Sequence, residues 1–336
     1  MVRTMLELQA VVLKAGCRPI SHAFQPGRIS VVLGRNHSGK TWLTRVVAGL
    51  EAPVAGELFM HGEPQSGIPP GDRSVALVYQ AFVNYPNWTV FQNLASPLKA
   101  ARRPEAEIRV RVTDIAEKLQ LSPLLDRYPQ ALSGGQQQRL AIGRALAKSA
   151  EVLVMDEPLV NLDYKLREAL QLELRSLLHE LGMSVIYTTS DPRDAFALAD
   201  ELLLISDHEL LQTGAPLSLY QSPDSVASAD LMSDPRTNRW QDGGKLKLIR
   251  PEHLYLEQTA ADDLAFPMEV LGNETNGSET FLHCRVAAGT EQAHWVARLA
   301  GLVALAPGEQ HRLFAPRSAV LSFEADGQRQ EAEARG

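Results

Sequence analysis

The stretch Gly34-Arg35-Asn36-His37-Ser38-Gly39-Lys40-Thr41 decides the fold of this chain. It follows an apolar run, residues 29–33, and leads into a helical pattern that extends to residue 50. The order of strand, glycine-rich turn and helix is the context in which G-x-x-x-x-G-K-[ST] binds phosphate. Gly34 and Gly39 allow the backbone to curl so that its N–H groups point inward, toward the positive end of the helix. The stretch therefore predicts a phosphate-binding loop.

Two side chains of this loop suit a nucleoside triphosphate. Lys40 supplies a positive charge for the β- and γ-phosphates, and the hydroxyl of Thr41 is a ligand for Mg²⁺. An ordinary glycine turn between a strand and a helix is the alternative for the motif taken alone. Further motifs in the order expected of an ATPase favour nucleotide binding.

Length and composition limit the other possibilities. A chain of 336 residues is long enough for two domains. The net charge of −7 gives no electrostatic reason to expect nucleic acid as a partner. Two cysteines, Cys17 and Cys284, are too few and too far apart to suggest a disulfide framework or a zinc site. No stretch approaches the roughly 18 apolar residues that would span a bilayer, so we expect other chains to provide any membrane-spanning part.

Residues 1–220 alternate strand and helix patterns, which predicts an α/β domain with a mainly parallel sheet covered by helices. A helical subdomain is expected at about 86–150, as an insert within it. Residues 221–244 are rich in Pro, Ser, Asp and Asn and are expected to form a linker. Short strand patterns then predict a small all-β, barrel-like domain over 245–323, followed by a disordered polar tail at 324–336.

A pair of carboxylates, Asp156 and Glu157, follows the apolar strand pattern of residues 152–155. A parallel sheet would bring this strand end to the same edge as the phosphate loop. Asp156 is then placed to hold Mg²⁺, and Glu157 is placed to polarise a water for in-line attack on the γ-phosphate. Such a pair is common on protein surfaces, and its position after a phosphate loop is what favours catalysis.

The stretch Leu132-Ser133-Gly134-Gly135-Gln136 opens another helix and forms a second anion-binding N-terminus capped by Ser133. Found between a phosphate loop and a strand ending in Asp-Glu, it makes residues 1–220 resemble the ATPase subunits of ABC transporters, which have the P-loop NTPase fold. The resemblance implies ATP and Mg²⁺ as cofactors and two ATPase subunits packed head to tail. Ser133, Gly134, Gly135 and Gln136 would then contact the nucleotide bound by the other subunit.

The same resemblance assigns further residues. Gln80 matches the glutamine that senses Mg²⁺ and the attacking water and that couples to membrane subunits. Asp163, in Asn161-Leu162-Asp163, matches the loop that crosses the ATPase dimer. Because the phosphate loop matches throughout, all of residues 34–41 would contact the nucleotide, although His37 stands at a variable position.

The C-terminal region extends the resemblance to carbohydrate importers of the maltose type, whose OB-like β-domain is regulatory. Its marks are Ile249-Arg250-Pro251-Glu252-His253 and Phe314-Ala315-Pro316-Arg317. Residues 82–86 and 161–167 more narrowly resemble ATPase subunits of glycerol or polyol importers. The implied partners are two integral-membrane permeases and, indirectly, a solute-binding protein, with the chain peripheral at the cytoplasmic face of the inner membrane.

Two departures from the family pattern stand out. Thr189-Ser190-Asp191 places Ser190 where the family usually has a histidine that bonds to the γ-phosphate, and serine is shorter and cannot become cationic. Between Leu8 and Ala23 there is no Phe, Tyr or Trp to stack on adenine. These departures suggest a half-degenerate site in a chain that pairs with a different ATPase subunit, as in glycerol importers that have two distinct ATPases.

Other functions remain open at this point. A soluble ABC ATPase of repair or translation is the alternative from another class, and a homodimeric importer ATPase for another sugar is the nearer one. A GTPase is not expected, because no Asn-Lys-x-Asp follows the phosphate loop. The transported solute is not encoded in any recognisable pattern.

Overall fold

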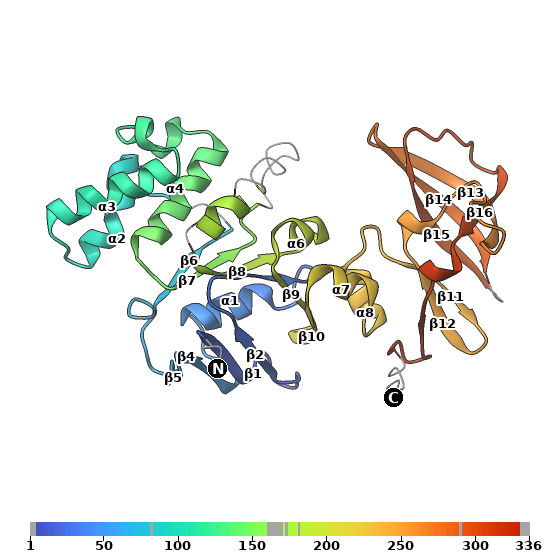
Figure 1. Ribbon diagram of the computed structural model, residues 1–336, viewed down its shortest axis with the longest axis horizontal. Helices are drawn as coiled ribbons and strands as arrows, with labels where there is room; N and C mark the ends of the chain where they lie inside the picture. The colour runs from blue at the N-terminus through green and yellow to red at the C-terminus, as the bar shows by residue number, and fades with distance from the viewer. Residues whose placement is uncertain are drawn as a thin grey trace. The chain divides into compact units, whose positions relative to one another are not determined.

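The computed structural model of the chain describes residues 5–80, 83–159, 171, 174–180, 182–288 and 291–329. It divides into two compact units, residues 1–217 and 218–336 (Figure 1). The boundary falls within helix α7, Pro216–Gln221, close to the expected end of the first domain at residue 220.

A mainly parallel sheet forms the centre of the first unit. Among the described residues its strand order is β10-β9-β3-β8-β7-β6, and only the edge strand β10 is antiparallel to its neighbour. The bounds are β3 Ile29–Leu33, β6 Val75–Val78, β7 Val152–Asp156, β8 Ser184–Thr189, β9 Glu201–Ser206 and β10 Glu209–Gly214. Every residue of β3, β7 and β8 is buried, as expected for parallel strands covered on both faces. Their carboxyl ends meet at one edge.

The N-terminal strands form a second, antiparallel sheet with the order β2-β1-β4-β5. Its strands are β1 Leu6–Val12, β2 Ile20–Phe24, β4 Ala55–Met60 and β5 Glu63–Pro64. Helix α1, Lys40–Ala48, packs Leu43, Val46 and Val47 into the same apolar core as residues of β1 and of the parallel sheet. Helix α1 is thereby held between the two sheets with its N-terminus at the end of β3 (Figure 1).

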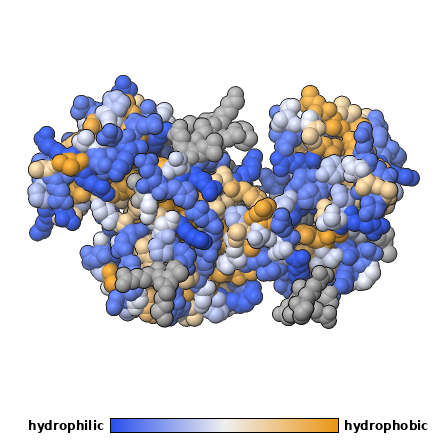
Figure 2. All heavy atoms as spheres, viewed as in Figure 1, coloured by the Kyte–Doolittle hydropathy of each residue, from blue (hydrophilic) through white to orange (hydrophobic). Residues whose placement is uncertain are grey.

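The helical insert contains α2 Val90–Ala100, α3 Glu105–Lys118 and α4 Gly134–Ala147, with short 3-10 turns at 122–124 and 129–131. Gly143 of α4 is buried and lies against Leu94 of α2 and Leu119, which ends α3. Figure 2 shows that the visible face of the insert is largely hydrophilic, so its helices bury one apolar face and present the other to solvent. Helix α6, Pro192–Leu198, follows strand β8 in the core.

The second unit is mainly antiparallel sheet. Strands β11 Asn238–Asp242, β12 Lys245–Ile249 and β17 Leu321–Phe323 form one sheet, and β13 Leu264–Thr275, β14 Glu279–Ala288, β15 Glu291–Ala300 and β16 Gln310–Ala315 form another. Single-turn 3-10 helices occur at 251–253 and 317–319. The rings of Trp240, Phe266 and Trp295 pack together with centroids 4.8–5.4 Å apart in its core. The expected all-β unit is thus present, and its long strand β13 turns directly into β14, with which it pairs antiparallel.

Two expectations for this part of the chain differ from the structure. Residues 221–244 are not a linker, because they contain α8, Val226–Leu231, and strand β11. The polar composition is explained by internal hydrogen bonds: Ser225 caps α8, and Asp230 accepts from Thr237 and Arg239. Residues 324–329 are also ordered, since Arg329 N–H donates to Asp224 O over 2.9 Å, while residues 330–336 lie outside the described ranges. No helix in the described part of the chain is long and apolar enough to cross a membrane.

Candidate nucleotide-binding site

The phosphate loop lies between β3 and α1, as the sequence predicts. Its first glycine, Gly34, has no room for a side chain, because an added Cβ would lie 2.3 Å from Ser38 Oγ and 2.5 Å from Ile205 O. Its second glycine, Gly39, adopts φ of 104° at the N-cap of α1, a left-handed conformation that favours glycine. The loop is therefore tightly curled around the N-terminus of a helix.

Main-chain hydrogen bonds fasten the loop to the neighbouring strands on both sides. Gly34 N–H donates to Thr189 O at the end of β8 over 3.2 Å, and Ser38 O accepts from His208 N–H in the β9–β10 turn over 2.8 Å. The buried Ser38 Oγ has no hydrogen-bond partner among the described residues. A buried polar atom without a partner suits a site that binds a polar ligand, and this one fits a phosphate group.

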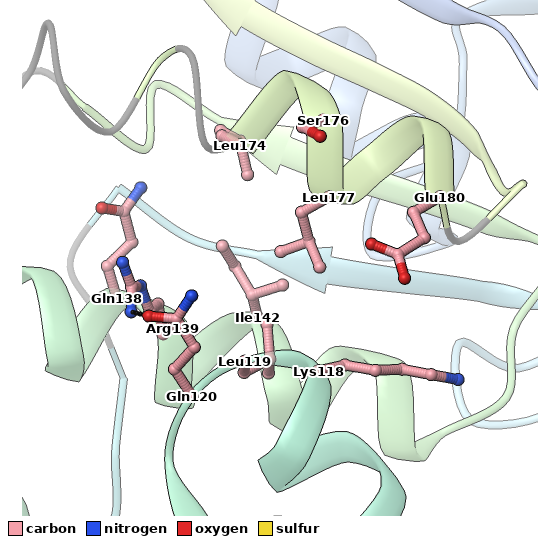
Figure 3. A pocket seen from close by; sticks show the side chains of 10 residues that line it. All are labelled: Lys118, Leu119, Gln120, Gln138, Arg139, Ile142, Leu174, Ser176, Leu177 and Glu180. Atoms are coloured by element: carbon pink, nitrogen blue, oxygen red, sulfur yellow. Dashed lines mark hydrogen bonds between the residues drawn. The ribbon is translucent and has the colours of Figure 1, made fainter.

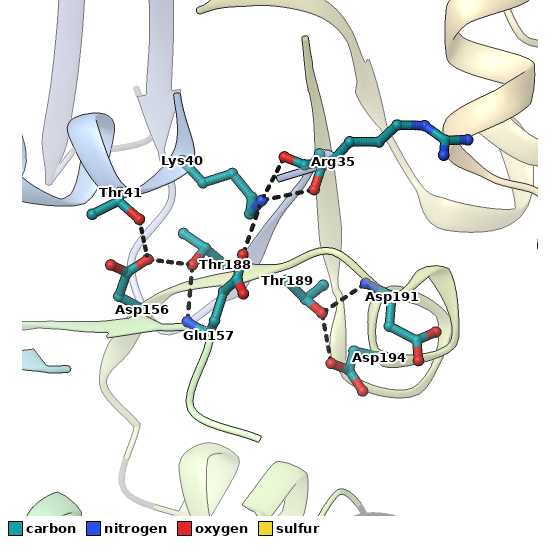
Figure 4. A network of polar contacts seen from close by, with 10 residues as sticks. Arg35, Lys40, Thr41, Asp156, Glu157, Thr188, Thr189, Asp191 and Asp194 are labelled. Atoms are coloured by element: carbon teal, nitrogen blue, oxygen red, sulfur yellow. Dashed lines mark hydrogen bonds and ion pairs between the residues drawn. The ribbon is translucent and has the colours of Figure 1, made fainter. Parts of the chain in front are cut away.

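Lys40 points back across the loop (Figure 4). Its ammonium donates to Gly34 O over 2.8 Å and to Arg35 O over 2.9 Å, and it pairs with Glu157 Oε1 at 2.9 Å. The side chains of Lys40 and Glu157 are 3% and 11% exposed, so this ion pair is shielded from water. The sequence motif predicted the lysine for phosphate, and the structure places the predicted catalytic carboxylate beside it.

Thr188 of β8 links the two predicted carboxylates. Its hydroxyl donates to Asp156 Oδ1 over 2.8 Å and accepts from Glu157 N–H over 3.0 Å, while Thr41 Oγ1 reaches the same Asp156 oxygen at 3.4 Å. Glu157 has a positive φ of 46°, which is strained for a non-glycine residue and is stabilised by these bonds. Thr41 and Asp156 lie together as oxygen donors suited to Mg²⁺.

Strand β8 ends in a polar turn that holds the segment around Ser190. Thr189 Oγ1 donates to Asp194 Oδ2 over 2.6 Å and accepts from Asp191 N–H over 3.1 Å, and Asp191 caps helix α6 (Figure 4). Ser190 itself is half-buried. The positions on either side of Ser190 are therefore fixed by hydrogen bonds.

A pocket of about 540 Å³ brings together eight of the predicted site residues, namely residues 36–41, Gln80 and Glu157. Its described lining is Asn36, His37, Ser38, Gly39, Lys40, Thr41, Trp42, Arg45, Gln80, Glu157 and His208. The pocket includes Gln80, which is 40 residues from Lys40 in sequence, and it does not include Ser190 or the start of α4 among the described residues that line it. Asp163 lies outside the described residues.

The start of α4 is closed by hydrogen bonds among its own residues. Ser133 Oγ accepts from Gln136 N–H over 3.3 Å, and Gln136 Oε1 accepts from Ser133 N–H over 3.0 Å, which is a complete capping box. Ser133 and Gly134 are exposed. Ser133 and Gly134 are therefore presented at a surface, Gly135 is buried and Gln136 is half-buried, and none of the four is among the described residues that line the phosphate-loop pocket of the same chain.

A second pocket, of about 250 Å³, lies between the insert and the helical residues 174–180 (Figure 3). Its lining includes Gln138, Arg139, Leu174 and Glu180. It contains none of the residues that the sequence predicts for phosphate or metal binding. This second pocket is therefore not a candidate for the predicted phosphate and metal site.

Four residues of the site were missed from the sequence, and Arg45 of α1, which lines the pocket, is one of them. Thr188 is an ordinary strand residue until the register of β7 and β8 places it opposite Asp156. Trp42 follows the phosphate motif directly. An aromatic residue at that position was the sequence signal that could have placed it in the site. His208 gave no signal in sequence, because it reaches the loop only through the β9–β10 turn.

The chain matches models of two known families. Residues 17–160 match the ABC transporter family, and residues 248–323 match the TOBE domain. It is 34% identical over 334 residues to the alpha-glucoside transport ATP-binding protein AglK of Rhizobium meliloti, covering 90% of this chain and 91% of that protein. It is 36% identical over 338 residues to the sn-glycerol-3-phosphate import ATP-binding protein UgpC of Rhodopseudomonas palustris, covering 92% and 93%.

Among solved structures, CbiO1 of Clostridium perfringens, part of the ABC transporter complex cbiONQ, has a similar fold. The TM-score is 0.60 at 22% identity, covering 68% of this chain and 95% of that one. The phosphate loop, the paired carboxylates and the β-unit agree with the two family matches and with relatives that span nearly the whole chain. The chain therefore belongs to the ATP-binding subunits of ABC transporters that import carbohydrates, and it is an ATPase.

Proposed function

We propose that this chain binds ATP with Mg²⁺ in the phosphate-loop pocket and hydrolyses it with Glu157 as the general base. The observation that carries the proposal is the buried pair of Lys40 and Glu157 at 2.9 Å, inside the curled loop. An ammonium and a carboxylate held together out of water are matched to a phosphate and an attacking water, respectively.

Different residues of the site would bind the phosphates, hold Mg²⁺ and accept the proton. The loop N–H groups and Lys40 would hold the β- and γ-phosphates, with Ser38 Oγ as a further donor. Once a phosphate takes up the Lys40 ammonium, the Glu157 carboxylate is free to accept a proton from water. Thr41 and Asp156 would hold Mg²⁺, which neutralises charge on the phosphates when bound. Thr188 keeps both carboxylates in place, and Gln80 borders the same pocket.

Two substitutions separate binding from hydrolysis. Glu157→Gln should keep the affinity for ATP and lower the hydrolysis rate by about 100-fold or more, because it removes the proton acceptor. Lys40→Ala should weaken ATP binding itself. Glu180→Gln, in the second pocket, is the matched control and should change neither quantity. Calorimetry for binding and phosphate release for turnover measure both. Full turnover in Glu157→Gln would reject the assigned base.

We further propose that the chain works at the cytoplasmic face of the inner membrane with two permeases and, indirectly, a solute-binding protein. A groove of about 450 Å³ between the core sheet and the insert supports this proposal. Its lining includes exposed Tyr79, Val83 and Tyr85, and Arg144 lies 4.2 Å from the centroid of the Tyr85 ring. Aromatic residues and arginine are enriched at interface cores, so the groove suits a helix of a permease.

Glycerol or another polyol is the solute we propose within the carbohydrate class. The support is the sequence resemblance at residues 82–86 and 161–167, together with relatives named for alpha-glucoside and sn-glycerol-3-phosphate. Uptake of radiolabelled glycerol by cells with and without the gene for this chain tests the solute. The soluble repair or translation ATPase is not favoured. The two relatives are named as transport and import proteins, and the match covers more than 90% of the length of each.

The exposed start of α4 needs the nucleotide of a second ATPase subunit, and we propose that this subunit is a different chain. The proposal rests on Ser190, which leaves this chain's own switch without the histidine common in the family, while residues 133–136 keep their cap. Native mass spectrometry of the complex purified through this chain is the test. One copy beside another ATPase agrees with the proposal, and two identical copies refute it in favour of a homodimer.

A further inference from the structure

The part of the pocket beyond the phosphates is lined by rings. Lys40, Thr41 and the loop fix where the phosphates of a nucleotide would lie. The remaining described lining includes Trp42 and Arg45 in the first turns of α1, and His208 in the β9–β10 turn. The base of a bound nucleotide must therefore be sought near these side chains.

Trp42 is placed as a platform. Its neighbours in α1, Leu43, Val46 and Val47, are buried in the core, whereas Trp42 is 37% exposed and borders the pocket. Its indole contacts no other aromatic ring among the described residues. An indole that stays open to solvent immediately after a phosphate loop is a surface on which a flat base can stack.

His208 forms a second part of the wall. Its backbone has φ of 68°, and its N–H donates to Ser38 O over 2.8 Å, which fixes the residue against the loop. The imidazole lies over Gly39, where an added Cβ would come within 3.0 Å of a ring carbon. Within the described ranges the ring makes no side-chain hydrogen bond, so both of its nitrogens remain available to a ligand.

The turn between β1 and β2 reaches the same region without a Phe, Tyr or Trp. The turn between β1 and β2 touches the β9–β10 turn, since Cys17 Sγ donates to Asp207 O over 3.4 Å. Residues 8–23, which include this turn, have no Phe, Tyr or Trp. We propose that the base of ATP stacks on Trp42, with His208 as the second ring against it. This inference rests on the proposed binding of ATP in the phosphate-loop pocket.

The test compares ATP with tripolyphosphate, which has the phosphates and no base. Both dissociation constants are measured by calorimetry on the full-length chain with Mg²⁺. Trp42→Ala should weaken ATP binding by roughly ten-fold, within the range of base stacking on an aromatic ring, and leave tripolyphosphate binding unchanged. Trp42→Phe should restore most of the affinity, and His208→Ala should cause a smaller loss for ATP alone. Trp88→Ala is the matched control, because Trp88 is also exposed and lies outside the pocket.

The possible outcomes distinguish base stacking on Trp42 from ATP binding in the phosphate-loop pocket. Unchanged ATP affinity in Trp42→Ala overturns the inference. An equal loss for ATP and tripolyphosphate also overturns it, because Trp42 would then shape the loop without touching the base. A wild-type chain that binds neither compound refutes the proposed ATP site. Quenching of tryptophan fluorescence by ATP that disappears in Trp42→Phe is expected as the independent sign of contact.

Discussion

At the scale of single residues, the arrangement of the candidate site was predictable wherever it is local in sequence. The phosphate loop contains its glycines, Lys40 and Thr41 within eight consecutive residues, and the structure places them together. Asp156 and Glu157 were found from a strand end. Thr188 was not, because its contact with Asp156 spans 32 residues and depends on the register of two parallel strands. A short motif cannot report such a contact.

Thr188 gives a prediction about catalysis. Thr188→Val keeps the shape and removes the hydroxyl that holds Asp156 and accepts from Glu157 N–H. Losing a buried hydrogen-bond partner costs about 1–3 kcal/mol, so we expect hydrolysis to fall about ten-fold or more while ATP binding changes little. Steady-state phosphate release and calorimetry provide the two measurements.

The control for this prediction is Thr280→Val in the second unit. Thr280 is equally buried, and its hydroxyl donates to Gly301 O over 2.8 Å. It should affect stability and leave turnover unchanged. Wild-type turnover in Thr188→Val would show that the carboxylates are held without this hydroxyl.

At the scale of elements, hydrophobic periodicity predicted which segments form strands or helices. It did not predict which strands pair with one another. The alternation in β1 is clear, with Leu6 and Leu8 buried, yet it does not say that β1 pairs with β4 in a separate antiparallel sheet. The linker expected at 221–244 was wrong for a related reason. Polar side chains such as Ser225 and Asp230 are as suited to capping and internal hydrogen bonds as to solvent.

The insert depends on a close approach of helices at one glycine. A Cβ on Gly143 of α4 would meet Leu94 Cδ2 at 2.5 Å and Leu119 Cδ1 at 2.8 Å. Gly143→Val should therefore overpack the insert and destabilise it by about 1–3 kcal/mol. Hydrogen exchange should show faster exchange in α2, α3 and α4, with the core sheet unaffected.

Val110→Ala is the comparison for this change, since Val110 lies on α3 with 73% of its surface exposed. It should leave exchange in the insert as it is in the wild type. Protection in Gly143→Val equal to wild type would mean that α2 and α4 can separate at no cost.

At the scale of the whole molecule, each unit contains a partly buried histidine whose pKa is lowered by that burial. The pKa of His22 in the first unit is lowered by burial, which outweighs the nearby Glu201 carboxylate at 3.4 Å. The pKa of His253 in the second unit is lowered chiefly by burial, with Glu252 opposing the shift. In the unfolded chain both histidines have the ordinary pKa of 6.5. Below pH 6.5 the unfolded chain therefore binds more protons at these positions than the folded chain does.

The pH dependence of stability follows from this sign. The contribution of both histidines to the free energy of unfolding is fully present above pH 6.5. It is lost as the pH falls through their lower pKa values in the folded state. We expect urea unfolding at pH 5.5 to begin at lower urea than at pH 7.5. His22→Gln and His253→Gln should each reduce that difference, while His311→Gln at an exposed position should not. An unchanged difference in both buried-site variants would contradict the assignment.

The two main-chain bonds at the phosphate loop have a consequence for how this chain can vary. Gly34 N–H and Ser38 O are bound to the backbones of residues 189 and 208, and not to their side chains. Mutations at Ser190 and His208 can therefore accumulate without displacing the loop. During evolution, substitutions at these two positions can change the hydrolysis rate and the base preference while the geometry of the phosphate loop stays the same. A serine at position 190 and an intact loop are then compatible within one protein.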